Sequence, residues 1–176
     1  SSLRQQIAYD LRTPAPPTYG IVIAVPISAT PYGGATVRRM VGDDINGWWA
    51  LARVVGGEYS THTLSGGDVH VVARHWYDGS VVVVREVECS DVVELASDGE
   101  GGVWAGGNGD GGSMVGCGGD GGGVVVTNGS GLLCHYGVSG VYVGRRVLST
   151  SGGSVEVRGL AEYVSGGVVA ILWSDG

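Results

Sequence analysis

The chain has 176 residues, which is enough for one domain with a sizeable core. Its formal net charge of −7 argues against a broad nucleic-acid-binding surface, because such a surface needs clustered basic residues. The sequence contains no continuous apolar run of the length that a membrane-spanning helix requires, so we predict no membrane span. All basic residues are arginine and there is no phenylalanine, a bias typical of a GC-rich coding sequence, as in actinobacteria, some algae and some RNA viruses.

Residues 1–31 are predicted to form an N-terminal arm that is rich in proline. All five prolines of the chain lie in it, between Pro14 and Pro31. Apolar residues spaced by four over residues 1–11 predict a short helix, and Ile21–Ile27 predicts a first strand. We expect residues 32–176 to form a single, mainly β domain.

The next segment, Ile45–Val55, predicts a helix. Asp43 or Asp44 would cap its first turn, and Gly56-Gly57 would end it. Its apolar residues recur at a roughly helical period and include Trp48-Trp49, which we expect to pack in the core.

Strands are predicted for most of the remaining chain. The predicted segments are Asp68–Arg74, Ser80–Val87, Asp91–Ala96, Val124–Thr127, Gly131–Val138, Val141–Ser149 and Val155–Arg158. Asp78-Gly79 is a typical hairpin turn between the first two of them. Residues 98–123 are more than half glycine and predict a loop, and residues 159–164 a short helical turn. The predicted fold class is α+β, mainly β, with an antiparallel sheet and one or two short helices.

The three cysteines are Cys89, Cys117 and Cys134. An odd number without paired spacing argues against a secreted disulfide framework and indicates a reducing compartment, so we expect a cytoplasmic protein. No Cys and His residues have the spacing of zinc ligands, and we predict no metal and no cofactor.

Residues 119–149 carry the strongest functional signal. Gly119-Asp120 precedes a valine strand, a turn follows, and then come His135-Tyr136-Gly137-Val138 and Val141-Tyr142-Val143-Gly144. A histidine within an apolar strand is costly unless its ring is hydrogen-bonded or used in chemistry. We therefore expect His135 to help order this hairpin.

This pattern resembles the H-box of the LRAT-like H-box/NC family. That family includes cellular lipid acyltransferases and phospholipases and the 2A proteins of certain picornaviruses. The resemblance implies an LRAT/NlpC-like fold with a catalytic histidine at His135 and a nucleophilic cysteine downstream of it. No cysteine follows Cys134 in this chain.

The resemblance without a downstream thiol predicts a non-enzymatic viral accessory protein. It would act in replication or in host interaction by binding host or viral proteins in the cytoplasm. Tyr136 and the doublet Arg145-Arg146 are the candidate binding residues. The sequence leaves the oligomeric state open.

An enzyme remains the alternative, either a thiol acyltransferase or phospholipase, or a cysteine protease with an all-β, chymotrypsin-like double barrel. Residues 119–124 resemble the nucleophile turn of such proteases, but Gly121 stands where the nucleophile would be. Cys117 is the nearby candidate thiol, although little chain separates it from the first histidines. A second candidate pair is His75 as base with Cys134 as nucleophile.

Overall fold

The computed structural model describes residues 34–87, 91–108, 114–115, 124–125, 130–151, 153–163 and 166–174. The predicted N-terminal arm and its strand therefore lie outside the described residues. Fourteen strands are described. They are β1 (Ala35–Gly42), β2 (Gly47–Val55), β3 (Glu58–Tyr59), β4 (His62–Thr63), β5 (Asp68–Trp76), β6 (Val81–Val87), β7 (Asp91–Ser97), β8 (Val103–Asn108), β9 (Met114–Val115), β10 (Val124–Val125), β11 (Gly131–Tyr136), β12 (Tyr142–Leu148), β13 (Val155–Tyr163) and β14 (Gly167–Ser174).

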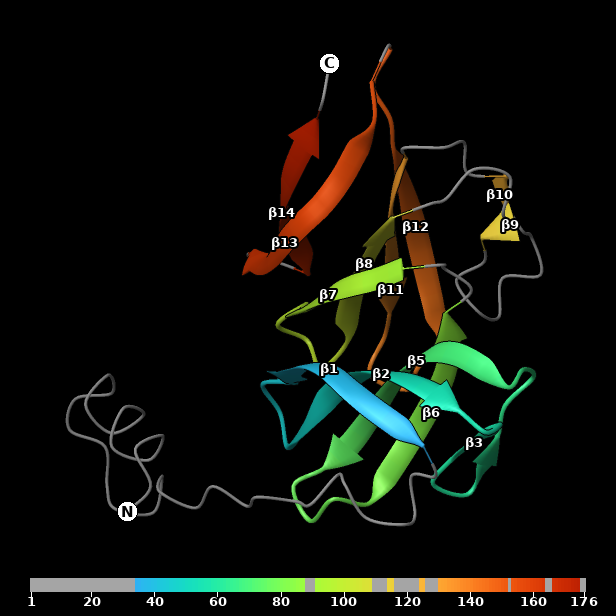
Figure 1. The fold of residues 1–176 in the computed structure, drawn as a ribbon. Helices are drawn as coiled ribbons and strands as arrows, with labels where there is room; N and C mark the ends of the chain where they lie inside the picture. The colour runs from blue at the N-terminus through green and yellow to red at the C-terminus, as the bar shows by residue number, and fades with distance from the viewer. Residues whose placement is uncertain are drawn as a thin grey trace, which may run out of the picture.

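The long strands form two antiparallel sheets of the same design (Figure 1). The first sheet, which we call unit 1, has the order β1-β2-β5-β6, and the short pair β3–β4 is inserted between β2 and β5. The second, unit 2, has the order β7-β8-β11-β12, and the short pair β9–β10 stands at the same place in the chain order. Strands β13 and β14 pair with each other and form the C-terminal hairpin.

Irregularities in strand pairing show that the units are structural repeats. The first hairpin of each unit and the C-terminal hairpin each contain one register shift between their two strands. The shifts fall between Val37 and Arg39, between Val92 and Glu94, and between Val157 and Gly159. The third and fourth strands of both units also share a shift, which lies at Arg74/His75 and at His135/Tyr136. Unit 2 therefore repeats unit 1, and the C-terminal hairpin repeats the first half of a unit.

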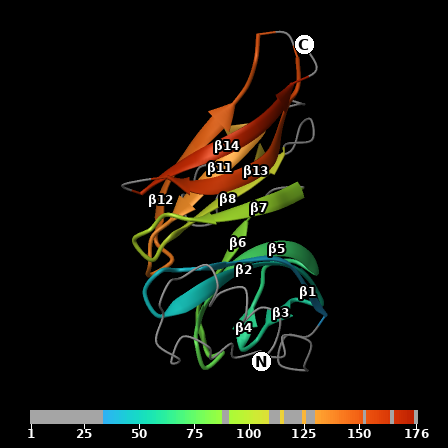
Figure 2. The ribbon, with the colours of Figure 1, turned by 90° about the vertical axis from the view of Figure 1, so that its left-hand side faces the viewer.

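The three parts are stacked face to face (Figure 2). Strand β7 lies against β1 on one side and against β13 on the other. The main core lies between the two four-stranded sheets and joins Trp49, Leu51 and Val72 of unit 1 to Val103 and Leu132 of unit 2. Burial of this apolar surface is the main force that holds the units together.

A second apolar cluster covers the far face of unit 1. Val54 and Val71 are buried there together with Tyr59 of β3. Residues of β2 and β5 are therefore buried on both faces of their sheet, which explains their nearly continuous apolar sequences.

The prediction of a mainly β, antiparallel fold is confirmed, but the described residues contain no helix. Residues 47–55, predicted as helix, form β2, and residues 159–163 belong to β13. Tertiary pairing decides the outcome at β2, because β1 and β5 hydrogen-bond to its two edges and both of its faces are covered. Within the described part of the chain, no helix has the length and apolar character needed to cross a bilayer.

The glycine-rich segment 98–123 is not one continuous loop. Its first part forms the turn between β7 and β8, followed by β8 itself, Val103–Asn108. Strand β8 pairs with β7 on one side and with β11 on the other. These two ladders supply the hydrogen bonds and packing that offset the conformational entropy of its glycines.

Candidate functional site

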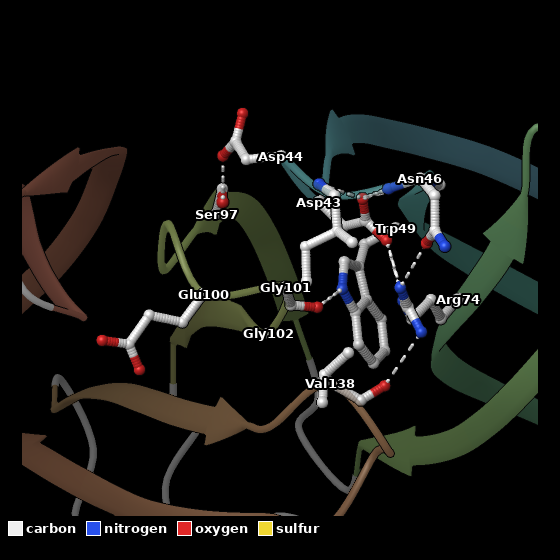
Figure 3. Close-up of polar contacts among 12 residues, drawn as sticks. Asp43, Asp44, Asn46, Trp49, Arg74, Ser97, Glu100, Gly101, Gly102 and Val138 are labelled. Carbon is white, nitrogen blue, oxygen red and sulfur yellow. Dashed lines mark hydrogen bonds and ion pairs between the residues drawn. The ribbon is translucent and has the colours of Figure 1, made fainter.

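A buried aspartate organises the turn between β1 and β2. Asp43 Oδ1 accepts hydrogen bonds from the backbone N–H groups of Ile45, Asn46 and Gly47 at 2.9, 3.0 and 2.8 Å. Its second oxygen, Oδ2, accepts one from Arg74 Nε on β5 at 2.9 Å and pairs with the same guanidinium through Nη2. Both side chains are buried, so the turn is closed by a desolvated ion pair (Figure 3).

These contacts keep Asp43 ionised. Burial alone would raise the pKa of its carboxyl group, but the backbone N–H of Ile45, the Arg74 guanidinium and the other two N–H groups together hold that pKa below its usual value. Arg74 also donates to Asn46 Oδ1 at 3.1 Å and to the carbonyl of Val138 in unit 2 at 3.3 Å (Figure 3). The Arg74 guanidinium therefore stabilises the β1–β2 turn and also links unit 1 to unit 2.

A second aspartate organises the matching turn between β7 and β8. Asp98 Oδ1 accepts hydrogen bonds from the backbone N–H groups of Glu100 and Gly102, both at 2.8 Å. Its Oδ2 lies 2.8 Å from His135 Nε2 on β11. The imidazole stacks on the Trp104 ring, with 4.3 Å between centroids and 8° between planes. His135, the strongest sequence candidate, is therefore held by a carboxylate and an indole.

Arg74 and His135 occupy equivalent positions. Each is the residue before the register shift in the third strand of its unit, and each lies opposite a tryptophan of the second strand. Arg74 pairs with Trp49, and His135 pairs with Trp104. Each also binds the aspartate of its own turn. The same position thus holds a group that can carry positive charge in both units.

The two tryptophans link each unit to the next part of the stack. Trp49 Nε1 of unit 1 donates to the carbonyl of Gly101 in the β7–β8 turn at 2.9 Å (Figure 3). Trp104 Nε1 of unit 2 donates to the carbonyl of Gly166, in the turn of the C-terminal hairpin, at 3.0 Å. The same side chain in successive units therefore satisfies a turn carbonyl of the following one.

The glycine between aspartate and tryptophan is needed because the third strand lies close to it. A Cβ atom added at Gly47 would lie 2.1 Å from the carbonyl oxygen of His75, and one added at Gly102 would lie 2.4 Å from that of Tyr136. Neither backbone position can accept a side chain without moving a paired strand. Aspartate, glycine and tryptophan thus act together in both turns.

Cys134 is disulfide-bonded in this structure. It lies in the core on β11, next to His135, and adjacent residues of a strand point to opposite faces. A sulfur held in a disulfide is not a thiolate and cannot attack a carbonyl. Cys134 therefore carries no free thiol in this structure.

His75 is fully buried and neutral at physiological pH. Its ring stacks on Trp48 with 3.9 Å between centroids, and Nε2 lies 3.0 Å from the Tyr59 hydroxyl. Nδ1 faces the carbonyl of Gly79 at 3.4 Å, so the neutral ring donates there and accepts from Tyr59. Burial lowers the pKa of His75 to about 4 against the weaker opposing effect of the Gly79 carbonyl. These contacts describe a packed core histidine.

Stability should fall on acidification through the pKa range of His75. An unfolded-state value near 6.5 and a folded value of about 4 mean that the unfolded chain binds the proton more readily. The free energy of unfolding should therefore decrease from pH 6.5 toward pH 4, by at most about 3 kcal/mol from this residue. Urea denaturation across this range measures the slope. His75→Gln, which cannot titrate, should flatten it, and an unchanged slope would contradict the assignment.

The remaining sequence candidates lie apart from the turns. Tyr136 is fully buried, with its ring edge-to-face against Tyr142, so it is not displayed to a partner. Arg145 and Arg146 lie on β12, opposite Cys134 and Leu133 of β11, and Arg146 is exposed. Cys117 and Gly121 lie outside the described residues.

A groove of about 570 Å³ opens between the two units. Its walls come from β4 and β6 of unit 1 and from the β11–β12 turn of unit 2, and they include His62, Arg85, Glu86 and Tyr142. Arg85 Nε donates to the carbonyl of Gly140 at 2.8 Å across this boundary. The groove is lined by both polar and apolar side chains, and it is shaped by both units.

The sequence analysis did not identify Asp98, Arg74 or the pairing of the two turns. A signal was present, because the pattern Asp-x-x-x-Gly-x-Trp occurs at Asp43–Trp49 and again at Asp98–Trp104. Recognition of this repeat would have predicted two equivalent hairpins and a strand in place of the helix. No family model, no curated protein and no solved structure matches the chain, so the site rests on its own geometry.

Proposed function

We propose that this protein acts by binding and not by catalysis. The observation that carries the proposal is the equivalence of His135 with Arg74. Arginine stays protonated in proteins and cannot serve as a general base. A position that holds arginine in one unit and histidine in its repeat is best explained by its contact with the turn aspartate, and not by proton transfer.

The sulfur chemistry agrees with this proposal. Cys134 is disulfide-bonded and buried, so the pair of His75 with Cys134 lacks a nucleophile. The groove between the units gives a concave surface with polar and apolar walls that a segment of another protein could enter. These observations favour a binding module over an acyltransferase, a phospholipase or a cysteine protease.

The biological setting comes from the H-box resemblance alone. From this resemblance we propose a viral accessory protein of the 2A type, with host or viral proteins as partners and a role in replication or host interaction. Cytoplasmic location stays a prediction. The disulfide at Cys134 weighs against it, because disulfides are rare in reducing compartments.

Exchange of the two equivalent residues tests the proposal. His135→Arg should fold and keep the melting temperature within about 2 °C of the wild type, since the guanidinium can pair with Asp98 and stack on Trp104. His135→Ala removes both contacts and should lower the melting temperature by about 5 °C.

Differential scanning fluorimetry on the three proteins measures both shifts. Arg74→His is the reciprocal variant. Its melting temperature should lie closer to the wild-type value at pH 6 than at pH 8, because only a protonated imidazole pairs ionically with Asp43. A His135→Arg protein that is as unstable as His135→Ala would show that the site requires an imidazole, and would reopen the enzymatic alternative.

A further inference from the structure

The groove between the two units runs along an open strand edge. Strand β6 is the last strand of unit 1 and, among the described residues, pairs only with β5. Its other edge therefore presents backbone N–H and C=O groups that face no neighbouring strand. Val84, Arg85 and Glu86 of β6 line the groove. The groove thus contains a strand edge to which a further extended segment can add.

The two walls of the groove stand on opposite faces of β6. Arg85 Nε donates to the carbonyl of Gly140, in the β11–β12 turn of unit 2, at 2.8 Å. The next residue, Glu86, accepts a hydrogen bond from the backbone N–H of Ser65 at 2.6 Å and another from the Ser65 hydroxyl. Adjacent strand residues point to opposite faces, so unit 2 stands on one face of β6 and residues 62–65 stand on the other. The open edge of β6 therefore lies between two walls, a shape that fits an extended chain.

The two charged side chains of the groove differ in their contacts. Glu86 is the only carboxylate among the lining residues, and both of its oxygens already accept hydrogen bonds from Ser65. Arg85 Nε and Nη1 donate to the carbonyls of Gly140 and Val84, and Nη2 has no partner among the described residues. No carboxylate in the described ranges forms an ion pair with Arg85. Its guanidinium is therefore bound only to neutral groups, and an acidic ligand would supply the missing negative charge.

We infer that the groove binds an extended, acidic segment of a partner protein, which adds a strand to the open edge of β6 and places a carboxylate on Arg85. The inference rests on the proposed function and specifies the chemistry of the partner. Backbone hydrogen bonds to β6 supply affinity for an extended chain, and the contact with Arg85 selects an acidic side chain. Leu64 and Val141, which line the groove from opposite walls, offer apolar contacts to the neighbouring side chains of the segment.

Fluorescence anisotropy with three labelled peptide libraries tests the inference on the full chain. Each library contains peptides of about eight residues, the length of a typical strand. The central position is fixed as glutamate in one library, as glutamine in the second and as lysine in the third. The glutamate library should bind about 10-fold more tightly than the glutamine library, because only a carboxylate forms a charge-assisted contact with Arg85. The lysine library should show no binding.

Arg85→Gln should abolish this preference, so that the glutamate and glutamine libraries bind within about 2-fold of each other. Arg53→Gln is the matched control, since it removes the same charge from an exposed arginine of β2 that lies outside the groove. It should keep the wild-type preference, and circular dichroism establishes that both variants are folded. Methylation of alternate backbone nitrogens in the tightest glutamate peptide leaves the protein unchanged. Binding should be weakened by one of the two alternations and not by the other, because only every second N–H of an added strand bonds to β6.

Hydrogen exchange of the chain without peptide reports whether the edge of β6 is open. The β6 amides that face away from β5 should exchange fast and become protected when the glutamate peptides bind. Slow exchange of all β6 amides in the free chain would mean that another segment of the chain covers the edge, which overturns the inference. So would failure of all three libraries to bind, equal binding of the three, or a preference that survives Arg85→Gln. Displacement of the peptides by inorganic phosphate would indicate a small-anion site and also overturns it. None of these outcomes alters the result expected for His135→Arg, so the proposed function is tested separately.

Discussion

Replacement of Asp43 by asparagine is expected to destabilise the protein by about 3–5 kcal/mol. Asparagine keeps the size of the side chain and one oxygen for the backbone N–H groups of the turn. It removes the negative charge that faces Arg74, whose guanidinium is buried and receives no comparable compensation from water. An uncompensated buried charge costs far more than the net contribution of the intact pair, which explains the size of the expected effect.

An exposed ion pair of the same chemistry provides the control. Arg53 and Asp68 form a bidentate contact across β2 and β5, and their side chains are 46% and 51% exposed. Asp68→Asn should change the free energy of unfolding far less than Asp43→Asn, because solvent screens the pair and solvates the arginine left behind. Urea denaturation of both variants measures the difference. Equal losses would show that Arg74 is not effectively buried in solution.

The strands were predictable where local signals agreed with the final pairing. The hairpin of β5 and β6 is a clear case, because Asp78-Gly79 separates two apolar runs and the turn closes through Gly79 N–H to the carbonyl of Trp76. Strands β11 and β12 were located in the same way from their apolar runs. Turn chemistry and alternating apolar residues act within a few residues of each other, so they are visible in the sequence.

Residues 45–55 show where local signals fail. Their apolar residues fit a helical period, and the acidic pair before them resembles a helix cap. In the structure, Asp43 instead accepts hydrogen bonds from backbone N–H groups of the turn between β1 and β2, and its partner Arg74 is distant in sequence. An apolar run buried on both faces of a sheet has no period-two pattern that distinguishes it from a buried helix.

The candidate site was predicted only in part. The cost of burying a polar ring drew attention to His135, and in the structure this ring is hydrogen-bonded to Asp98 and stacked on Trp104. Its role could not be determined from one unit alone. Comparison with Arg74 in the repeat identifies the shared feature, which is a nitrogen donor beside the turn aspartate. Only the strand registers make this comparison possible.

Replacement of Trp49 by alanine is expected to cost about 3–5 kcal/mol. The indole is fully buried in the core between units 1 and 2, so its removal leaves a large cavity at their boundary. It also leaves the carbonyl of Gly101 without its donor, in a turn that already depends on the Asp98 carboxylate. The loss should therefore weaken the contact between the units as well as the core of unit 1.

Trp49→Phe separates these two contributions, because phenylalanine fills most of the space but has no N–H group. It should cost about 1–2 kcal/mol, the penalty for a buried carbonyl that loses its partner. Tyr77→Ala, at an exposed aromatic residue of the β5–β6 turn, should change stability by about 0.5 kcal/mol or less. Hydrogen exchange adds the spatial information: amides of β7 and β8 should lose protection in Trp49→Ala together with those of β2. If only β2 responds, the indole stabilises its own sheet, and the repeated tryptophan does not couple one unit to the next.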